Sequence, residues 1–337
     1  MTNPVTVEVS RGGRVESAHR GAGAVVDANG RILFSFGDVE RPVYPRSAVK
    51  AFQALALVES GAADRWALGD DELALACASH SGEASHVALA AGVLAKAGLS
   101  EASLGCGAHW PLNAEAARAL AASGAQPSAL HNNCSGKHAG FLCLAADQGW
   151  DLGSYIAPEH PVQEAGRAAI EALTGERLDA ERRATDGCSI PTYAVSLKGL
   201  ALGFARFATG EGLEPQRAAA AARLRRAVVD HPHFVAGTGR FDTDVMSRFG
   251  ARAFTKTGAE GVFIAALPEA GLGIAVKADD GATRAAETMI AALIARFAGF
   301  DKAERGEAER FLAPEFRNWR GVPVGRMWAA GPLAAGV

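Results

Sequence analysis

The sequence lacks several features that would assign a protein to a simple class. Acidic and basic residues nearly balance, with a formal net charge of −3, so the composition indicates neither a nucleic-acid partner nor an anionic membrane. The first residues contain no basic segment followed by an apolar one, so no signal peptide is expected. Apolar runs elsewhere are interrupted by glycine or charge, so no membrane span is expected either.

Cysteine is also scarce, with five in 337 residues. An odd and sparse set favours reduced thiols or metal ligands over a disulfide framework. Together with the missing targeting signals, this pattern predicts a cytoplasmic protein. The chain shows no internal repeat, low-complexity tract or proline-rich linker, so neither a repeat protein nor a linked array is indicated.

Strand patterns lie near both ends of the chain, and helical patterns lie between them. The expected strands cover residues 5–9, 22–26, 32–36, 262–267, 274–277 and 323–327. Asp27 to Gly30 is a hairpin turn signal between two of them. We therefore predict an α+β fold in which N- and C-terminal strands form one antiparallel sheet. A single domain over residues 1–337 is expected, with its sheet region at about 1–45 and 250–337 and a mainly helical region at about 46–249.

The almost wholly apolar stretch at residues 45–59 predicts a buried helix. Pro45 suits the first turn of that helix, and Gly61 suits its end. Ser47 then lies near the helix N-terminus, with Lys50 one turn later on the same face. A lysine among apolar neighbours is costly to keep charged, and a neutral amine beside a hydroxyl is a general base. The alternative is a chance S-x-x-K pair whose lysine extends to solvent.

Two further motifs follow Ser47-x-x-Lys50 in order, namely Ser79-His80-Ser81 and Lys256-Thr257-Gly258. A similar trio marks the penicillin-recognising serine hydrolases, in which S-x-x-K, S-D-N and K-T-G cooperate. Lys256 precedes a predicted hairpin strand, which is where K-T-G belongs. The second motif is not S-D-N, so this resemblance favours the fold more than β-lactam chemistry.

A closer resemblance covers nearly the whole chain. The sequence resembles the class 3, rhizobial-type L-asparaginases of the asparaginase II family. The matching stretches are RSAVK at 46–50, CASHSGE at 77–83, HWP at 109–111, NNCSGKH at 132–138, DGCSIP at 186–191 and KTGAEG at 256–261. The resemblance implies a serine β-lactamase-like fold, a homodimer, and hydrolysis of L-asparagine to L-aspartate and ammonia.

The resemblance also implies two Ser–Lys pairs. Ser47 would be the nucleophile with Lys50 as its base, and Ser79 with Lys256 would extend the hydrogen-bonded network. The alternative for Ser79 is a turn serine that caps the following helix. The alternative for Lys256 is a solvated lysine on an edge strand.

Two of the cysteines lie in polar, glycine-containing stretches that suit a zinc site. Cys134, Lys137 and His138 share one helical face by their spacing, and Cys188 lies two residues after Asp186. Two thiolates and a nitrogen donor suit zinc. Spacing alone favours His138 as the nitrogen ligand, because a lysine must first lose a proton. The resemblance instead implies zinc on Cys134, Lys137 and Cys188. The alternative is buried, inert thiols.

Three further residues are expected near the substrate. By the resemblance Arg46 and His80 match substrate positions, and we assign Asp186 to the substrate or to the surroundings of the metal. These residues offer both signs of charge, which fits the carboxylate and the amine of an amino acid. The predicted enzyme is therefore an L-asparaginase. The alternatives are a glutaminase, a β-lactam hydrolase, or a non-catalytic ligand-binding protein on the same fold.

Overall fold

The computed structural model describes residues 2–334, and its contacts divide them into two compact units. The sheet unit contains the described residues up to Ala48, then Val195–Gly212, then those from Thr255 onward. The helical unit contains Val49–Ala194 and Leu213–Phe254. The chain thus crosses between the units within the Ser47-x-x-Lys50 motif, and the single-domain organisation stays a prediction.

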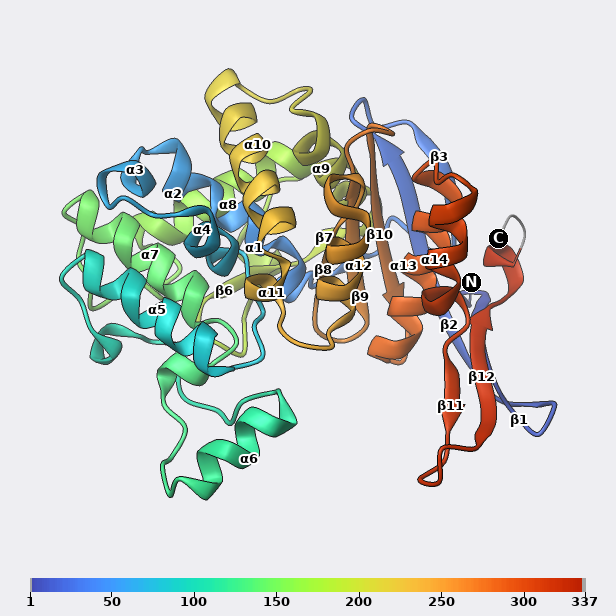
Figure 1. Cartoon of the computed structure of the whole chain (residues 1–337). Helices are drawn as coiled ribbons and strands as arrows, with labels where there is room; N and C mark the ends of the chain where they lie inside the picture. The colour runs from blue at the N-terminus through green and yellow to red at the C-terminus, as the bar shows by residue number, and fades with distance from the viewer. Residues whose placement is uncertain (1, 335–337) are drawn as a thin grey trace. The chain divides into compact units, whose positions relative to one another are not determined.

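The sheet unit confirms the predicted α+β class and the shared antiparallel sheet (Figure 1). Its strands run in the order β11-β12-β1-β2-β10-β9-β8, with β3 paired to β2, and every described pair is antiparallel. The strands are β1 (Val5–Arg11), β2 (Arg14–Asp27), β3 (Ile32–Phe36), β8 (Phe254–Thr257), β9 (Val262–Leu267), β10 (Leu272–Ala278), β11 (Glu315–Arg317) and β12 (Pro323–Ala329). The short strands β4 (Pro42–Val43) and β7 (Val195–Ser196) pair separately.

Strand β2 joins the two ends of the chain in one sheet. Its first part pairs with β1, and its second part pairs with β10 from Asp27↔Leu272 to Gly21↔Ala278. Helices α9 (Leu197–Thr209) and α13 (Thr283–Phe297) cover opposite faces of this sheet, with Gly273 facing α9 and Gly21 facing α13. Helix α14 (Lys302–Leu312) packs on α13. The apolar side chains of β9 and β10 are buried between these layers.

The helical unit is built around one fully buried helix segment. Every residue of α7 from Ser135 to Ala145 is buried, whereas α6 has no buried residue and stands apart from the other helices of its unit (Figure 1). The helices are α1 (Lys50–Gln53), α2 (Leu55–Glu59), α3 (Ala62–Arg65), α4 (Asp70–Ala76), α5 (Ala84–Lys96), α6 (Ala114–Ala122), α7 (Ser135–Asp147), α8 (Pro161–Thr174), α10 (Pro215–Asp230), α11 (Pro232–Val235) and α12 (Phe241–Phe249). Strands β5 (Arg183–Thr185) and β6 (Pro191–Tyr193) form a small pair.

The prediction of one continuous helix over residues 45–59 is wrong. The segment begins with a 3₁₀ turn, η1 (Arg46–Val49), and continues as the short helices α1 and α2 with Ala54 between them. Arg46 has a φ of 51°, which is left-handed and incompatible with a regular α-helix starting at Pro45. The amide of Ala48 donates to the Pro45 carbonyl, as in a 3₁₀ turn. Gly61, with a φ of 77°, ends the segment as expected.

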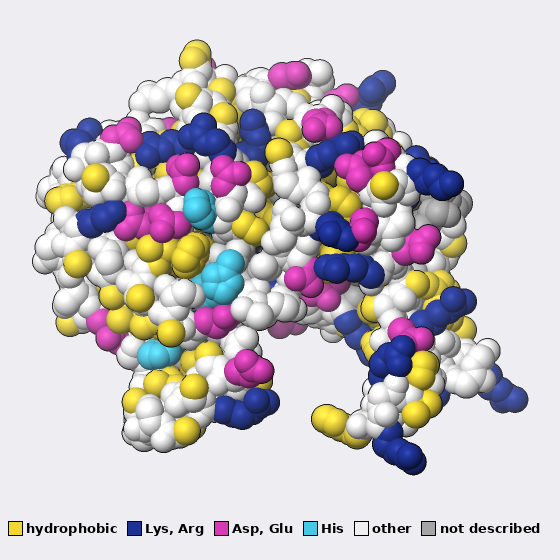
Figure 2. All heavy atoms as spheres, in the orientation of Figure 1, with side chains coloured by type: hydrophobic (Ala, Val, Ile, Leu, Met, Phe, Trp, Pro, Cys, Tyr) yellow, Lys and Arg dark blue, Asp and Glu magenta, His cyan; other side chains and the backbone are white. Residues whose placement is uncertain are grey.

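Charge and hydropathy are distributed without extremes. None of the helices in residues 2–334 combines the length and the apolar character needed to span a bilayer. On the face that Figure 2 shows, basic and acidic side chains lie interspersed instead of forming one region of a single sign. This mixture matches the small net charge of the chain.

Candidate active site

Lys50 is a predicted site residue whose amine is buried and hydrogen-bonded. It is the first residue of α1 and is 1% exposed. Its Nζ donates to the carbonyl oxygens of Ala78 at 2.5 Å and Asn133 at 3.3 Å, and contacts Ser79 Oγ at 3.0 Å. The motifs around Lys50, Ser79 and Asn133, which are far apart in sequence, therefore meet at one amine inside the helical unit.

These three partners limit what the amine of Lys50 can do with its protons. A backbone carbonyl only accepts hydrogen bonds, so Ala78 and Asn133 each hold one N–H of the amine. The amine also lies 3.0 Å from the hydroxyl of Ser79, which both donates and accepts, and it interacts with the side chain of Cys134. In its neutral form the amine keeps a lone pair that can accept a proton from a hydroxyl. The arrangement can therefore pass a proton between Lys50 and a hydroxyl without moving either carbonyl contact.

His80 is fully buried beside Ser79, and both of its ring nitrogens are hydrogen-bonded. Its Nδ1 accepts from the amide of Gly82 at 3.1 Å, so the ring proton lies on Nε2, which donates to Ser135 Oγ at 2.8 Å. Burial holds the pKa of His80 well below its ordinary value, and the neighbouring side chains of His86 and Lys50 add to the effect. His80 is thus a neutral ring that fixes its own loop, and its contact with substrate stays a prediction.

The structure brings Cys134, Lys137, Cys188 and Asp186 together. Cys134 occupies the N-cap position of α7 without a side-chain capping bond, and Lys137 follows on the first turn of that helix. The Nζ of Lys137 donates to Cys188 Sγ at 3.0 Å, and Cys188 Sγ lies 3.6 Å from Asp186 Oδ2. Both cysteines and the lysine are buried. The cluster lies wholly in the helical unit.

The electrostatics of this cluster favour one thiolate, on Cys134, because the hydrogen bond with Cys134 and burial raise the pKa of Cys188. The hydrogen bond from Cys188 lowers the pKa of Cys134 well below that of a free thiol, and Lys50 and Lys137 lower it further against the effect of burial. Burial alone lowers the pKa of Lys137, but Cys188, Cys134 and Asp186 outweigh it and raise the pKa above its ordinary value. A thiolate is the form of cysteine that binds metal.

The donor set of the cluster fits zinc. Cys134, Cys188 and Lys137 would supply two sulfur donors and one nitrogen donor to a bound zinc ion. Binding through Lys137 requires that its amine lose a proton, which a cation beside two thiolates would promote. His138, the ligand that spacing favours, has its Nδ1 hydrogen-bonded to Tyr155 Oη at 2.6 Å, and its buried Nε2 has no hydrogen-bond partner among residues 2–334.

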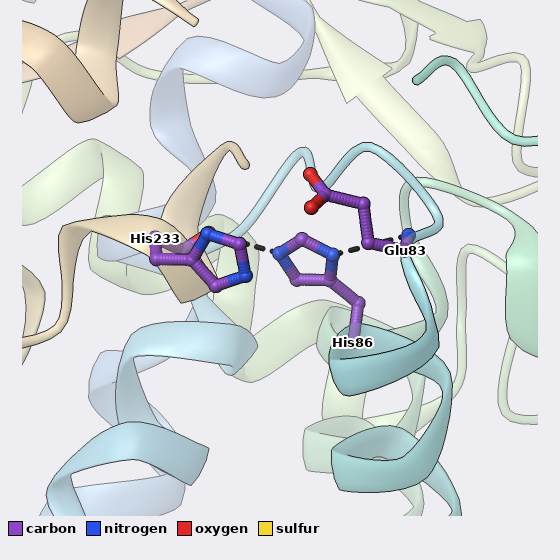
Figure 3. Close-up of side chains that lie close together, drawn as sticks. All are labelled: Glu83, His86 and His233. Carbon is purple, nitrogen blue, oxygen red and sulfur yellow. Dashed lines mark hydrogen bonds between the residues drawn. The ribbon is translucent and has the colours of Figure 1, made fainter. Parts of the chain in front are cut away.

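Sequence reasoning missed a second group of side chains that could hold a metal ion. One ligand atom from each of Glu83, His86 and His233 lies within 4.8 Å of the others (Figure 3). His86 follows Glu83 by three residues, but His233 is far away in sequence, so no spacing pattern identifies the group. Only the fold of the helical unit brings α5 and α11 together.

The remaining predicted residues belong to the sheet unit. Ser47 is half-buried in η1, and Arg46 before it has the left-handed φ of 51°. Lys256 lies within β8, not before a strand, and is 0% exposed, so it is not a solvated edge-strand lysine. Its Nζ donates to the Thr257 carbonyl at 2.9 Å.

The glycine of K-T-G explains how this strand approaches the nucleophile motif. A Cβ on Gly258 would lie 2.6 Å from the carbonyl oxygen of Pro45, a distance that real Cβ atoms do not adopt. Only glycine therefore allows the end of β8 to lie against the residue that opens η1. Within the sheet unit, the K-T-G motif is consequently adjacent to the turn that carries Ser47.

The family model described as L-asparaginase II matches residues 7–329. The comparison with curated proteins found no match.

Several solved structures are similar to this chain at low identity. Mglu is 19% identical with a TM-score of 0.42, over 84% of this chain and 69% of that one. A beta-lactamase from Mycobacterium bovis is 14% identical with a TM-score of 0.42, over 86% and 94%. Simvastatin synthase from Aspergillus terreus is 13% identical with a TM-score of 0.41, over 86% and 93%. In two further Mglu structures the chain spans 64% and 61% of their length.

Proposed function

Because this chain belongs to the L-asparaginase II family of amidohydrolases, we propose that it hydrolyses L-asparagine to L-aspartate and ammonia. The observation that carries the proposal is the buried amine of Lys50. Two backbone carbonyls hold this amine, and it contacts the hydroxyl of Ser79. A buried lysine arranged in this way costs stability and serves chemistry, not packing. A non-catalytic binding protein has no use for such a proton relay.

The proposed reaction proceeds through a covalent serine ester. Ser47 attacks the side-chain amide carbon of asparagine, and Lys50 accepts the proton of its hydroxyl. The network of Ser79 and Lys256 returns a proton to the nitrogen that departs as ammonia. Water then attacks the β-aspartyl ester and restores Ser47. Within the helical unit, the contact of Lys50 with Ser79 supports this assignment. Within the sheet unit, the close approach of Gly258 to Pro45 supports it.

Zinc is the proposed metal, held by Cys134, Lys137 and Cys188. When bound, it would supply positive charge beside Asp186, which lies next to Cys188. The chain already provides a nucleophile in Ser47 and a base in Lys50, so the residues around the metal have a binding role. Asp186, with Arg46 and His80, is proposed to orient the amine and the carboxylate of the amino acid. We further propose a homodimer, and a cytoplasmic location that fits the small and odd number of cysteines.

Substrate preference is a direct test of this proposal. The purified protein is expected to release ammonia from L-asparagine. The extra methylene of L-glutamine should lower kcat/KM by about 10- to 100-fold, the usual discrimination for one methylene. A chromogenic cephalosporin lacks the free α-amine and should be cleaved negligibly. Faster turnover of glutamine or of the cephalosporin than of asparagine would assign the protein to one of the alternative amidohydrolases.

Metal content tests the proposed zinc site. Protein purified without chelator is expected to carry about one zinc per chain, and Cys188→Ser should lose it. The loss should mainly raise KM for asparagine, with a smaller effect on kcat than removal of the nucleophile. Cys143→Ser is the matched control. Its buried thiol contacts the carbonyl of Val93 outside the cluster, and burial raises its pKa to about 12.

Elemental analysis of the three proteins decides between the outcomes. A parent free of metal argues against the site altogether. Equal zinc in the parent and in Cys188→Ser argues that the ligands are elsewhere, and the Glu83, His86 and His233 group is then the next set to substitute.

A further inference from the structure

The side chain of His86 connects two backbone segments of the helical unit. Its Nδ1 accepts from the amide of Glu83 at 3.2 Å, so its ring proton lies on Nε2. That Nε2–H donates to the backbone carbonyl of His233 at 2.9 Å (Figure 3). Both nitrogens of this buried ring are therefore used, one for each segment.

The ring of His86 is also the middle member of a stack. The ring centroid of His80 lies 5.0 Å away at an interplanar angle of 12°, and that of His233 lies 4.7 Å away at 17°. His80 repeats the same pattern of bonds, because its Nδ1 accepts from Gly82 and its Nε2 donates to Ser135. Two stacked neutral imidazoles thus hold two successive amides of the loop 79–83.

The same loop is joined at further points to the segment 233–238. The amide of Ser79 donates to the Val235 carbonyl at 2.9 Å, and Ser81 Oγ donates to the Ala236 carbonyl at 2.7 Å. At the other end, the carboxylate of Glu83 accepts from the amide and the hydroxyl of Thr238, both at 2.8 Å. Bonds of this number and regularity fix the position of the loop backbone, and Ser79 Oγ is the hydroxyl that meets Lys50.

We propose that His86 is a positioning residue for the reaction, which holds the loop 79–83 against the segment 233–238 so that Ser79 stays in contact with Lys50. The inference rests on the proposed function for its effect on turnover. An error of about 1 Å in a catalytic group can cost about 100-fold in rate, so a residue that fixes the loop carrying Ser79 has a measurable effect on turnover.

The hydrogen bonds favour this role over metal binding by the same residues. A metal needs the lone pair of a ring nitrogen, but the Nδ1 lone pair of His86 is held by Glu83 N–H and its Nε2 carries a proton. The rings of His86 and His233 are stacked nearly parallel, so their in-plane lone pairs do not converge on one point. Both oxygens of the Glu83 carboxylate are occupied by Thr238.

Four substitutions separate the contributions of His86. His86→Ala removes the ring, and His86→Phe keeps a stacked ring without either hydrogen bond. His86→Asn keeps an acceptor at the Nδ1 position for Glu83 N–H, and His86→Gln keeps a donor at the Nε2 position for the His233 carbonyl. The alanine and phenylalanine forms are expected to lose about 10- to 100-fold in kcat for asparagine, with KM changed less than about threefold. The asparagine and glutamine forms should each recover part of the loss.

A purely structural role makes a different prediction, because His86 also follows the capping-box pattern at the start of α5. In that case kcat should follow the midpoint of thermal unfolding across all four variants. Such a correlation, or an alanine form with the kcat of the parent, overturns the proposal. Zinc and nickel content are measured in parallel, and a metal ion present in the parent but lost in His86→Ala assigns the residue to a metal site instead.

Hydrogen exchange tests the clamp without reference to turnover. The amides of Ser79 and Gly82 do not bond to His86, yet both should exchange at least about tenfold faster in His86→Phe if the ring holds the loop. Thr238→Val, at an exposed position, loosens the opposite end of the clamp and should accelerate the same amides even if the His86 variants do not fold. Unchanged exchange in a folded variant contradicts the proposal. A parent that is inactive on asparagine but shows this exchange pattern would argue only against the proposed function.

Discussion

Ser47→Ala is expected to lower kcat for L-asparagine by about 10³-fold or more, which corresponds to about 4 kcal/mol of lost transition-state stabilisation. The hydroxyl is the proposed nucleophile, and alanine offers no atom that can form the β-aspartyl ester. Because the change removes one oxygen from a half-buried turn, the midpoint of thermal unfolding should move little. Ser100→Ala, at an exposed serine whose hydroxyl caps no helix, is the matched control and should keep the activity of the parent.

The experiment must also separate Ser47 from Ser79, because Ser79 Oγ is the serine oxygen at 3.0 Å from Lys50 Nζ. Rapid acid quenching during turnover should trap the aspartyl ester, and peptide mass spectrometry should place it on the peptide that contains Ser47. Ser79→Ala should lose activity through the proton network while leaving Ser47 able to be acylated. An ester on Ser79, or an Ser47→Ala enzyme within a few-fold of the parent, would reverse the two roles.

The fold was predictable where the pattern of apolar residues repeats locally. The hairpin at Asp27 to Gly30 and the β9–β10 pair have turn residues between apolar runs, so both their existence and their pairing follow from sequence. The first half of β2 was missed because residues 14–20 are mostly polar and exposed, and that part pairs only with β1. The break in the segment 45–59 was missed because a left-handed φ at Arg46 leaves no signal in composition.

The site was predictable only in part for a different reason. Lys50 contacts Ser79 and Asn133, which lie 29 and 83 residues away in the sequence. Lys137 contacts Cys188, which lies 51 residues away. Single-sequence spacing covers one or two helical turns, so it finds Cys134 with Lys137 but cannot find Cys188. The resemblance to a family supplied that residue. His86 bonds to His233, 147 positions away in the sequence, so neither residue spacing nor the resemblance to a family predicted this contact.

Lys50→Arg tests whether the buried amine acts as a base or only as a charge. Arginine keeps the positive charge and hydrogen-bond donors, but it does not lose a proton in the working pH range. We expect Lys50→Arg to lower kcat by at least about 10³-fold, similar to the effect of Ser47→Ala. The nucleophile and its base act in the same step, so the loss of either one costs a similar amount of activity. Lys198→Arg, at an exposed lysine paired with Glu40, is the control for lysine-to-arginine exchange and should remain fully active.

A second substitution at the same position makes the result unambiguous. Lys50→Met removes both the charge and the basic nitrogen while keeping an unbranched side chain, so it tests the amine without the bulk of a guanidinium group. If proton transfer is the role, both variants should be inactive from about pH 6 to pH 9 while circular dichroism shows a folded protein. If the ammonium serves only to stabilise the Cys134 thiolate or a substrate carboxylate, arginine should retain much of the activity that methionine loses. An active arginine form across neutral pH therefore excludes Lys50 as the general base, and the carbonyls of Ala78 and Asn133 would then be holding a permanently charged ammonium.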